Sequence, residues 1–474
     1  MKRRLQALLL ALVAIACSSP RVTASAPPPP GNPDFASAAA SVRTLLGQMV
    51  AADTTNPPGN EARVVALGVR RLDAAGIPYE VTEFAPGREN LVARLAGDGS
   101  KGPVLLLAHT DVVGAAGQDW SLPPHEMTEK GGFLYGRGVN DDLGMAAIEL
   151  EVLLLLKKAG VALSRDVILA WTGDEESGGA GIQWLLENRP DSVAADVVLN
   201  EGGGIVLGRD GVPERIELQT AEKTYQDFTL TTYGPTGHSS VPLGDNAIYR
   251  MSRALSRVGR HTFPARLLPV TRANLTARAA EEDGPLADAM KALASAKGAL
   301  PDDALEVADG DPGLAANLRT TCVATTIEGG TRVNALPAEV RANVNCRILP
   351  DETIREVATE LVRIIGDPEV EIESDGEFGY AAPSPLDGPG PDAIRAAAED
   401  MWPGLPIVPF MSRGATDSRF LRAKGIPAYG IDPLALTEED GRRAHVIDER
   451  IPADGLRPAV EFLYRVVIEL AGQR

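Results

Sequence analysis

Cysteine, aromatic side chains and positive charge are all scarce in this chain. Three cysteines in 474 residues exclude a disulfide-dense scaffold. The formal net charge of −19 predicts that nucleic acid is not a partner, because phosphates are bound by basic surfaces. Hydrophobic residues make up 44% of the chain and charged residues 23%, which is typical of a globular protein. Only five histidines occur, so each one that follows an apolar run is informative.

Residues 1–33 are predicted to be an export signal followed by a tether. Three basic residues at positions 2–4 precede the apolar segment Leu5–Ala16, which is too short to cross a bilayer. The sequence from Ala14 to Ser18 resembles a lipobox, which predicts acylation of Cys17 and anchoring in the periplasm or cell envelope. The alternative is cleavage after Ala26, which would release a soluble secreted protein. Membrane contact is expected only through the lipid anchor, and the prolines that follow are typical of an extended tether.

The remaining length, about 440 residues, predicts two domains. Residues 34–222 alternate between buried strands and a helix at Met145–Lys158. This β/α alternation is typical of an α/β domain with an open, mostly parallel sheet. The predicted strands are Asn90–Leu95, Val104–Ala108, Val167–Trp171 and Val197–Leu199.

Polar residues follow three of these strands. They are His109-Thr110-Asp111, Asp174-Glu175-Glu176 and Asn200-Glu201-Gly202-Gly203. Ligands bind beyond the carboxyl ends of parallel strands, so we expect one imidazole and several carboxylates to meet at one edge of the sheet.

Residues 223–349 have a different pattern and are predicted to form an inserted α+β domain, after which residues 350–474 complete the first domain. Alternating or strand-like runs occur at Asp227–Thr232, Thr320–Ile327 and Ala338–Leu349. Cys322 and Cys346 lie on two of these runs. They either form a disulfide across a hairpin or remain two buried free thiols.

Five side chains have the chemistry of zinc ligands: His109, Asp141, Glu176, Glu201 and His445. Two zinc ions set against three carboxylates leave roughly one positive charge, which suits a bound hydroxide and an anionic substrate. Asp111 is placed to orient the His109 imidazole. The adjacent Glu175 and Glu176 point in opposite directions in extended chain, so one can bind metal while the other acts as a base.

The segments that carry these residues resemble the two-zinc exopeptidases and deacylases. That family includes aminoacylase, acetylornithine deacetylase, succinyl-diaminopimelate desuccinylase and bacterial glutamate carboxypeptidase. The resemblance runs in collinear order from about Val42 to the C-terminus. Each segment alone also fits an ordinary structural role, but the family motifs coincide at five places. They are His109-Thr110-Asp111, Gly136-Arg137-Gly138-Val139-Asn140-Asp141-Asp142, Asp174-Glu175-Glu176, Asn200-Glu201-Gly202-Gly203 and Ala444-His445.

The resemblance implies a ligand arrangement and a fold. His109 and Glu201 would bind the first zinc, Glu176 and His445 the second, and Asp141 would bridge them. Co²⁺ or Mn²⁺ are the alternative metals. Glu175 would be the general base. The implied fold is a zinc-exopeptidase catalytic domain with an inserted ferredoxin-like domain, which serves as lid and dimerisation domain.

The resemblance also implies substrate-binding residues. In the inserted domain, His238 would stabilise the oxyanion in the partner subunit's site, and Asn334 and Arg347 would bind substrate, Arg347 through a carboxylate. Gly414 and Thr416 resemble part of a substrate loop. Two departures from the family pattern are Leu143, where lysine is frequent, and Ala415, where glycine is frequent.

These features predict an exported zinc metallohydrolase that cleaves an amide bond next to a free carboxylate. A carboxypeptidase or dipeptidase acting on short peptides is the first expectation, since an exported enzyme is suited to scavenging. The alternative is an N-acyl amino acid amidohydrolase. A remote alternative, an inactive binding lipoprotein, is opposed by the presence of Glu175 and all five ligand residues.

Overall fold

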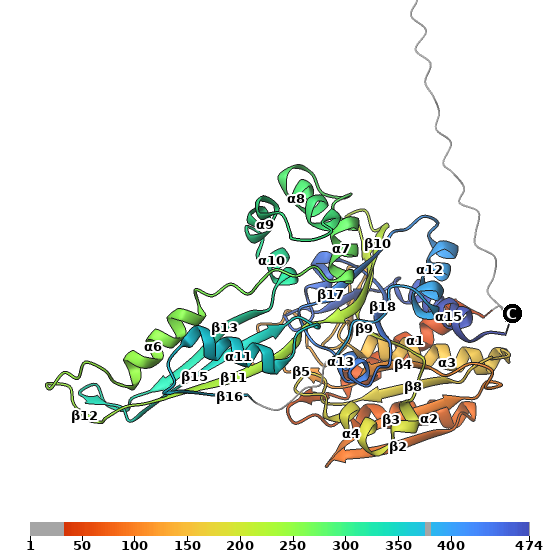
Figure 1. The fold of residues 1–474 in the computed structure, drawn as a ribbon. Coiled ribbons are helices and arrows are strands. Elements are labelled where there is room, and N and C mark those ends of the chain that lie inside the picture. The colour runs from red at the N-terminus through yellow and green to blue at the C-terminus, as the bar shows by residue number, and fades with distance from the viewer. Residues whose placement is uncertain (1–32, 375–380, 474) are drawn as a thin grey trace, which may run out of the picture.

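The computed structural model describes residues 33–374 and 381–473, which form a catalytic α/β domain and an elongated inserted domain (Figure 1). The predicted leader, including Cys17, lies outside the described residues. Among the helices in the described ranges, none is long and apolar enough to cross a membrane.

The catalytic domain is built on a mixed, mostly parallel sheet. Eight described strands lie in the order β17-β10-β18-β9-β4-β8-β3-β2. The pairs β17/β10, β18/β9, β9/β4 and β4/β8 are parallel, and β3 and β2 add an antiparallel edge. The bounds are β2 Tyr79–Ala85, β3 Arg88–Leu95, β4 Val104–His109, β8 Val167–Thr172, β9 Val197–Leu207, β10 Pro213–Glu222, β17 Ile407–Ser412 and β18 Ala428–Thr437.

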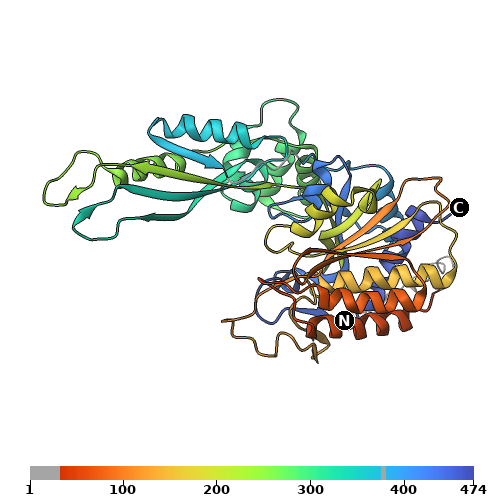
Figure 2. The same cartoon turned by 90° about the horizontal axis from the view of Figure 1, so that it is seen from below.

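Helices cover both faces of this sheet, which explains why its central strands are continuous apolar runs. In β4, Val104 and Leu106 pack with α1, α3, α12 and α15, whereas Leu105 and Leu107 pack with α4, α5 and α13. Figure 2 shows α1 and α3 side by side beneath the sheet. The bounds are α1 Phe35–Ala51, α2 Ala62–Ala75, α3 Leu143–Ala159, α4 Ala180–Asn188, α5 Pro190–Val193, α12 Pro389–Met401, α13 Ser418–Ala423, α14 Glu438–Gly441 and α15 Leu456–Ala471.

The inserted domain has an antiparallel sheet in the order β13-β15-β11-β16. Its chain order of β11, α6, β13, β15, α11 and β16 is that of a ferredoxin-like unit, as predicted. Helices α7–α10 interrupt it between α6 and β13, and α7 packs against β17 of the catalytic domain. The bounds are β11 Thr224–Tyr233, α6 Ala247–Val258, α7 Pro269–Arg278, α8 Gly284–Ser295, α9 Asp302–Asp309, α10 Pro312–Leu318, β13 Thr321–Gly329, β15 Glu339–Ile348, α11 Ile354–Ile365 and β16 Val370–Ser374.

The structure corrects two predicted boundaries. The inserted domain does not end at Leu349, because β16 pairs with β11 and α11 packs against α6, so it extends to Ser374. The strand predicted at Val197–Leu199 continues to Leu207, because it keeps its pairing with β18 and β10. Glu201 therefore lies within β9 and not beyond its end.

Short strands complete the framework, and a disulfide joins two strands of the inserted sheet. Cys322 and Cys346 are direct partners on β13 and β15, with their Cα atoms 4.1 Å apart, and their sulfurs are bonded. Of the two alternatives for these cysteines, the structure has the disulfide. The short strands are β1 Thr55–Asn56, β5 Val112–Val113, β6 Thr128–Lys130, β7 Phe133–Tyr135, β12 Gly237–His238, β14 Ala335–Leu336 and β19 Arg450–Pro452.

Candidate active site

The five predicted ligand residues reach one place from five different segments. His109 ends β4, Asp141 precedes α3, and Glu176 lies in the turn between β8 and α4. Glu201 lies within β9, and His445 follows α14 in a left-handed conformation with φ 66°. The open, largely parallel sheet thus brings these side chains to one edge, as ligand sites in such sheets require.

Asp141 stands between two pairs of side chains. On one side, His109 Nε2 lies 3.0 Å from Asp141 Oδ1 and 3.9 Å from Glu201 Oε1. On the other side, His445 Nε2 lies 3.1 Å from Asp141 Oδ2 and 3.0 Å from Glu176 Oε2. One carboxylate oxygen of Asp141 therefore faces each pair, which is the arrangement that a bridging ligand needs.

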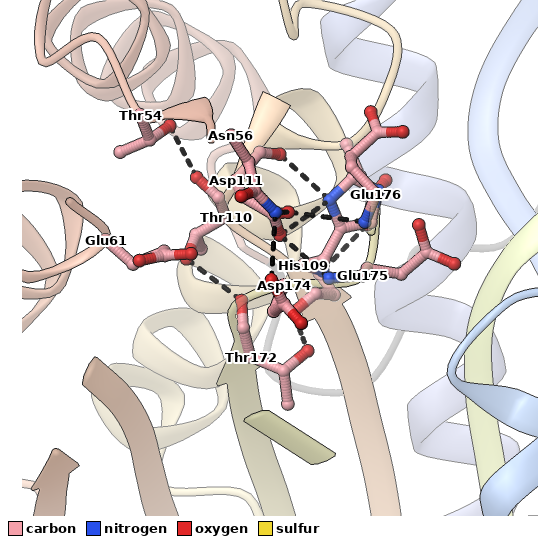
Figure 3. A network of polar contacts seen from close by, with 12 residues as sticks. Thr54, Asn56, Glu61, His109, Thr110, Asp111, Thr172, Asp174, Glu175 and Glu176 are labelled. Atoms are coloured by element: carbon pink, nitrogen blue, oxygen red, sulfur yellow. Dashed lines mark hydrogen bonds and ion pairs between the residues drawn. The ribbon is translucent and has the colours of Figure 1, made fainter. Parts of the chain in front are cut away.

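Asp111 is fully buried and organises both the imidazole and the glutamates (Figure 3). His109 Nδ1 lies 3.6 Å from Asp111 Oδ1 and 3.0 Å from its carbonyl oxygen. The Asp111 carboxylate also accepts the backbone N–H groups of Glu175 (3.1 Å) and Glu176 (3.2 Å). Asp111 therefore acts through its neighbours, as a positioning residue for the predicted ligand His109 and for the predicted base.

The electrostatics of the cluster favour a cation. Burial raises the pKa of Glu175 and of Glu201 well above the usual range. Burial also opposes ionisation of Asp141, but contacts with His109 and His445 outweigh it and lower its pKa. Because the carboxylates crowd together with two imidazoles among them, a divalent cation would relieve their mutual repulsion.

Glu449 is a site residue that the sequence did not reveal. This buried carboxylate accepts the backbone N–H groups of Gly138 (3.1 Å), Asn140 (2.8 Å) and Asp141 (3.1 Å), and it pairs with Arg137 Nη1 at 2.7 Å. Burial raises its pKa to about 7. Glu449 thus fixes the loop that presents Asp141. Its position four residues after His445 was the only signal in the sequence.

Two of the predicted substrate residues lie at the junction of the domains. Arg347 stacks on the Tyr225 ring at 4.6 Å and donates a hydrogen bond to the Arg413 carbonyl at 3.2 Å. Gly414 follows Arg413 and is exposed. The structure thus places Arg347 beside the predicted substrate loop.

Thr416 in the same loop has a structural role in this conformation. Its side chain is buried, and both its hydroxyl (2.5 Å) and its N–H (2.8 Å) donate to Glu222 Oε1. Glu222 in turn forms a buried ion pair with Arg422 at 2.9 Å. Because its hydroxyl is engaged, Thr416 holds the loop in place and does not present that group to a ligand.

His238 and Asn334 are brought together, but far from the five ligand residues of the same chain. The Ser239 N–H donates to the Asn334 carbonyl at 3.0 Å, and β12 pairs with β14. Figure 1 shows these strands at the tip of the inserted domain, well away from the end of β4. Both His238 and Asn334 are exposed there.

A cavity of about 980 Å³ opens beside Asp141 and Glu201. Apolar side chains of the sheet line part of it, and the helical segment α7–α10 lines another part. Asn274 of α7 is tied to β17 by a hydrogen bond from its Nδ2 to the Pro409 carbonyl at 3.1 Å. The apolar lining residues include Ile205, Val206, Val408, Phe410, Met411, Leu434 and Leu436.

Comparison with known proteins decides the family. The model of Peptidase family M20/M25/M40 matches residues 105–469. The chain belongs to this family. The N-fatty-acyl-amino acid synthase/hydrolase PM20D1 of Xenopus tropicalis is 29% identical over 382 residues, which cover 77% of this chain and 72% of that protein. Aminoacylase-1 of Pongo abelii is 25% identical over 435 residues, which cover 90% and 95%.

The fold agrees with a solved M20 structure. The M20 family metallo-carboxypeptidase Sso-CP2 from Sulfolobus solfataricus superposes with a TM-score of 0.70 at 20% identity, covering 91% of this chain and 98% of that one. The family drawn from the sequence motifs is therefore confirmed, as is the combination of a mostly parallel α/β sheet with an inserted antiparallel sheet.

One solved M20 structure of similar fold, the YXEP protein of Bacillus subtilis, is described as a dinuclear metal-binding peptidase. The donor set of this chain suits a divalent metal. Two overlapping groups offer ligand atoms that all lie within 4.8 Å of one another: His109, Asp141 and Glu176, and His109, Glu175 and Glu201. Glu176 Oε1 is buried and has no hydrogen-bond partner among the described residues, which suits a metal ligand. Imidazole nitrogen and carboxylate oxygen are donors that zinc accepts.

Proposed function

We propose that this M20 hydrolase uses two zinc ions, with Co²⁺ or Mn²⁺ as alternatives, to cleave an amide bond next to a free carboxylate. The observation that carries the proposal is Asp141 between the His109–Glu201 and His445–Glu176 pairs, with Glu175 beside them. The family makes the chain a metallohydrolase, and the adjacent Glu175 supplies the base that amide hydrolysis needs.

Each residue of the proposed site has a distinct role in the reaction. When bound, the metal ions would polarise the scissile carbonyl and lower the pKa of a water molecule. Glu175 accepts the proton of that water and passes it to the departing amine. Arg347 binds the substrate carboxylate through its planar guanidinium. His238 of the partner subunit donates a hydrogen bond to the oxyanion.

Short peptides are the first substrate class, because the C-terminal residue of a peptide carries the required carboxylate. Carboxypeptidase or dipeptidase activity is then expected.

N-acyl amino acids carry the same carboxylate, and the cavity favours them as a second candidate. If the carboxylate lies at Arg347, the acyl group is left to fill the cavity beside Asp141. The apolar part of its lining, which lies among charged side chains such as Glu217 and Arg278, could contact an acyl chain. The name of the PM20D1 relative describes action on N-fatty-acyl amino acids.

Release of free amino acid from a substrate panel tests the proposal. The panel contains dipeptides, N-acetyl amino acids and N-oleoyl amino acids, and chelator-treated protein is the control. Chelator-sensitive release from any member supports the hydrolase, and no release from any of them with two metals bound contradicts it.

A cavity-filling variant tests the second candidate. Val206→Trp, which fills the cavity, should slow N-oleoyl hydrolysis and spare N-acetyl hydrolysis. Val212→Trp, on a nearby exposed turn, is the matched control.

The inserted domain is proposed to form a homodimer. His238 belongs to β12, which lies at the tip of the inserted domain (Figure 1), far from the metal-ligand cluster of its own chain. The tip of a partner chain would supply His238 to that cluster. Exposed apolar side chains accompany His238 at the tip, including Val241 and Val333. Exposed apolar groups of this kind are typical of contact surfaces. Sedimentation velocity tests the dimer, and a monomer at assay concentration would contradict it.

Export remains part of the proposal and rests on residues 1–33 alone. We expect Cys17 to be acylated and the protein to lie in the periplasm or cell envelope, with secretion after cleavage at Ala26 as the alternative. Metabolic labelling with a fatty acid tests this, because Cys17→Ala should abolish the label. A wild-type protein without label would favour the soluble secreted form if found outside the cell, and would overturn export if found in the cytoplasm.

A further inference from the structure

A chain of polar contacts runs from the protein core to the turn that carries Glu175 (Figure 3). Asn56 is buried, and its Nδ2 donates to Asp111 Oδ2 at 2.8 Å and to Asp174 Oδ1 at 3.1 Å. Arg88 Nη1 donates to the same Asp174 oxygen at 2.6 Å. Asn56 therefore joins the carboxylate that holds the Glu175 backbone to the residue immediately before Glu175.

The turn needs such support because its backbone is unusual. Asp174 has a φ of 70°, a conformation that residues other than glycine rarely adopt. Its Oδ2 accepts the Ala180 N–H at 3.2 Å, which closes the turn at the start of α4. The Asp174 side chain is thus held from both sides, by Ala180 on one oxygen and by Asn56 and Arg88 on the other.

Arg88 connects this turn to a rigid part of the fold. Its Nε donates to Glu61 Oε2 at 3.1 Å, and Glu61 is fully buried at the start of α2. Burial opposes the charge of Arg88, but hydrogen bonds to Glu61 and Asp174 outweigh it and raise its pKa. Arg88 therefore stays charged and offsets the negative charges of Glu61 and Asp174.

We propose that Asn56 and Arg88 are positioning residues for the base Glu175, an inference that rests on the proposed amide hydrolysis. Glu175 and Glu176 are neighbours with different tasks, so their common backbone must be fixed for one to face the metals while the other faces the reacting water. Asn56 and Arg88 fix it through Asp111 and Asp174. Among the described residues, neither forms a hydrogen bond or ion pair with the five predicted ligands, and only Asn56 reaches them indirectly, through Asp111. We therefore expect both residues to act mainly on the turn and little on metal binding.

The first test is Asn56→Ala, which removes two hydrogen bonds and no charge. We expect kcat to fall about 10- to 100-fold, the range for residues that orient catalytic groups. KM should stay within about twofold, and two metal ions per chain should remain. Asn188→Ala, at an exposed asparagine whose Nδ2 donates to the Trp184 carbonyl, is the matched control and should match wild type. A purely structural role would instead lower the unfolding temperature and leave kcat of the folded protein unchanged, which would overturn the inference.

The second test compares Arg88→Lys with Arg88→Gln. Lysine keeps the charge and should retain more of kcat than glutamine, with equal metal content in both variants. Removing a buried charge partner can unfold a protein, so the unfolding temperature of the metal-free protein is measured alongside. Arg94→Gln is the matched control, because Arg94 lies on the same strand and forms an ion pair with Asp166 at 2.8 Å, at the other end from the turn. Equal kcat for Arg88→Lys, Arg88→Gln and wild type would overturn the role of Arg88.

The proposed function and the positioning role can fail separately. If metal-loaded wild-type protein hydrolyses no amide in the panel, the proposed function is overturned, and the positioning role falls with it. If wild type is active and Asn56→Ala is equally active, the positioning role alone is overturned.

Discussion

Glu149 is a fully buried carboxyl group in the middle of α3. Burial raises its pKa well above the usual range, and the neighbouring Asp142 and Asp432 add to the rise. The folded protein therefore holds the Glu149 proton at pH values where the unfolded chain has lost it. Stability from this group is full below the unfolded pKa of about 4.5 and is lost as the pH rises toward the folded pKa.

Glu149→Gln should remove this pH dependence. Above pH 4.5 wild type should lose stability relative to the variant. The difference in their free energies of unfolding should grow by about 1.4 kcal/mol for each pH unit, until the folded pKa is reached. Urea unfolding of both proteins from pH 4.5 to pH 9 measures the difference. A difference that stays constant over this range would show that Glu149 is ionised in the folded protein.

A functional residue could be predicted from the sequence only where its side chain had suitable chemistry and its position matched a recognisable motif. His109 and Glu176 could be found because they follow buried strands within recognisable motifs. Asn56, Arg88 and Glu449 could not, because isolated polar residues outside any recognisable motif look like many surface residues until the fold brings them beside the site. Thr416 was assigned to substrate from its motif, but the sequence does not show that Glu222 takes up its hydroxyl.

At the scale of elements, the disulfide joins β13 to β15 in the inserted domain. It closes a loop with a sequence separation of 24 residues, so removing it should lower the free energy of unfolding of that domain by about 3 kcal/mol. Cys322→Ala/Cys346→Ala measured by urea unfolding, with and without reductant, tests this. Reductant should destabilise wild type and leave the variant unchanged, and insensitivity of wild type to reductant during urea unfolding would contradict a stabilising disulfide.

Strands buried on both faces were predicted well, because a short apolar run such as Val104–Ala108 between polar turns is typical of a central strand. The end of the inserted domain was predicted poorly. The amphipathic helix α11 and the short strand β16 suit either domain by pattern alone, and only the pairing of β16 with β11 assigns them. Likewise, glycines 202–204 look like a turn, although long-range pairing keeps them within β9.

At the scale of the whole molecule, the position of His238 predicts that two chains share each active site. Mixed dimers of His238→Ala and Glu175→Gln would contain one site with an intact Glu175 and an intact His238 from the partner. Random mixing makes half of the dimers mixed, with one of two sites competent, so co-refolded protein should recover about a quarter of wild-type turnover. No recovery, with mixed dimers present by mass spectrometry, would show that His238 does not act across the interface.

The central claim is that Glu175 is the base beside a two-metal site held by His109, Asp141, Glu176, Glu201 and His445. The most direct measurement is turnover and metal content of Glu175→Gln beside wild type, on the best substrate of the panel. We predict that turnover falls at least about 100-fold while two metal ions per chain remain bound. Near-normal turnover by Glu175→Gln would contradict the claim.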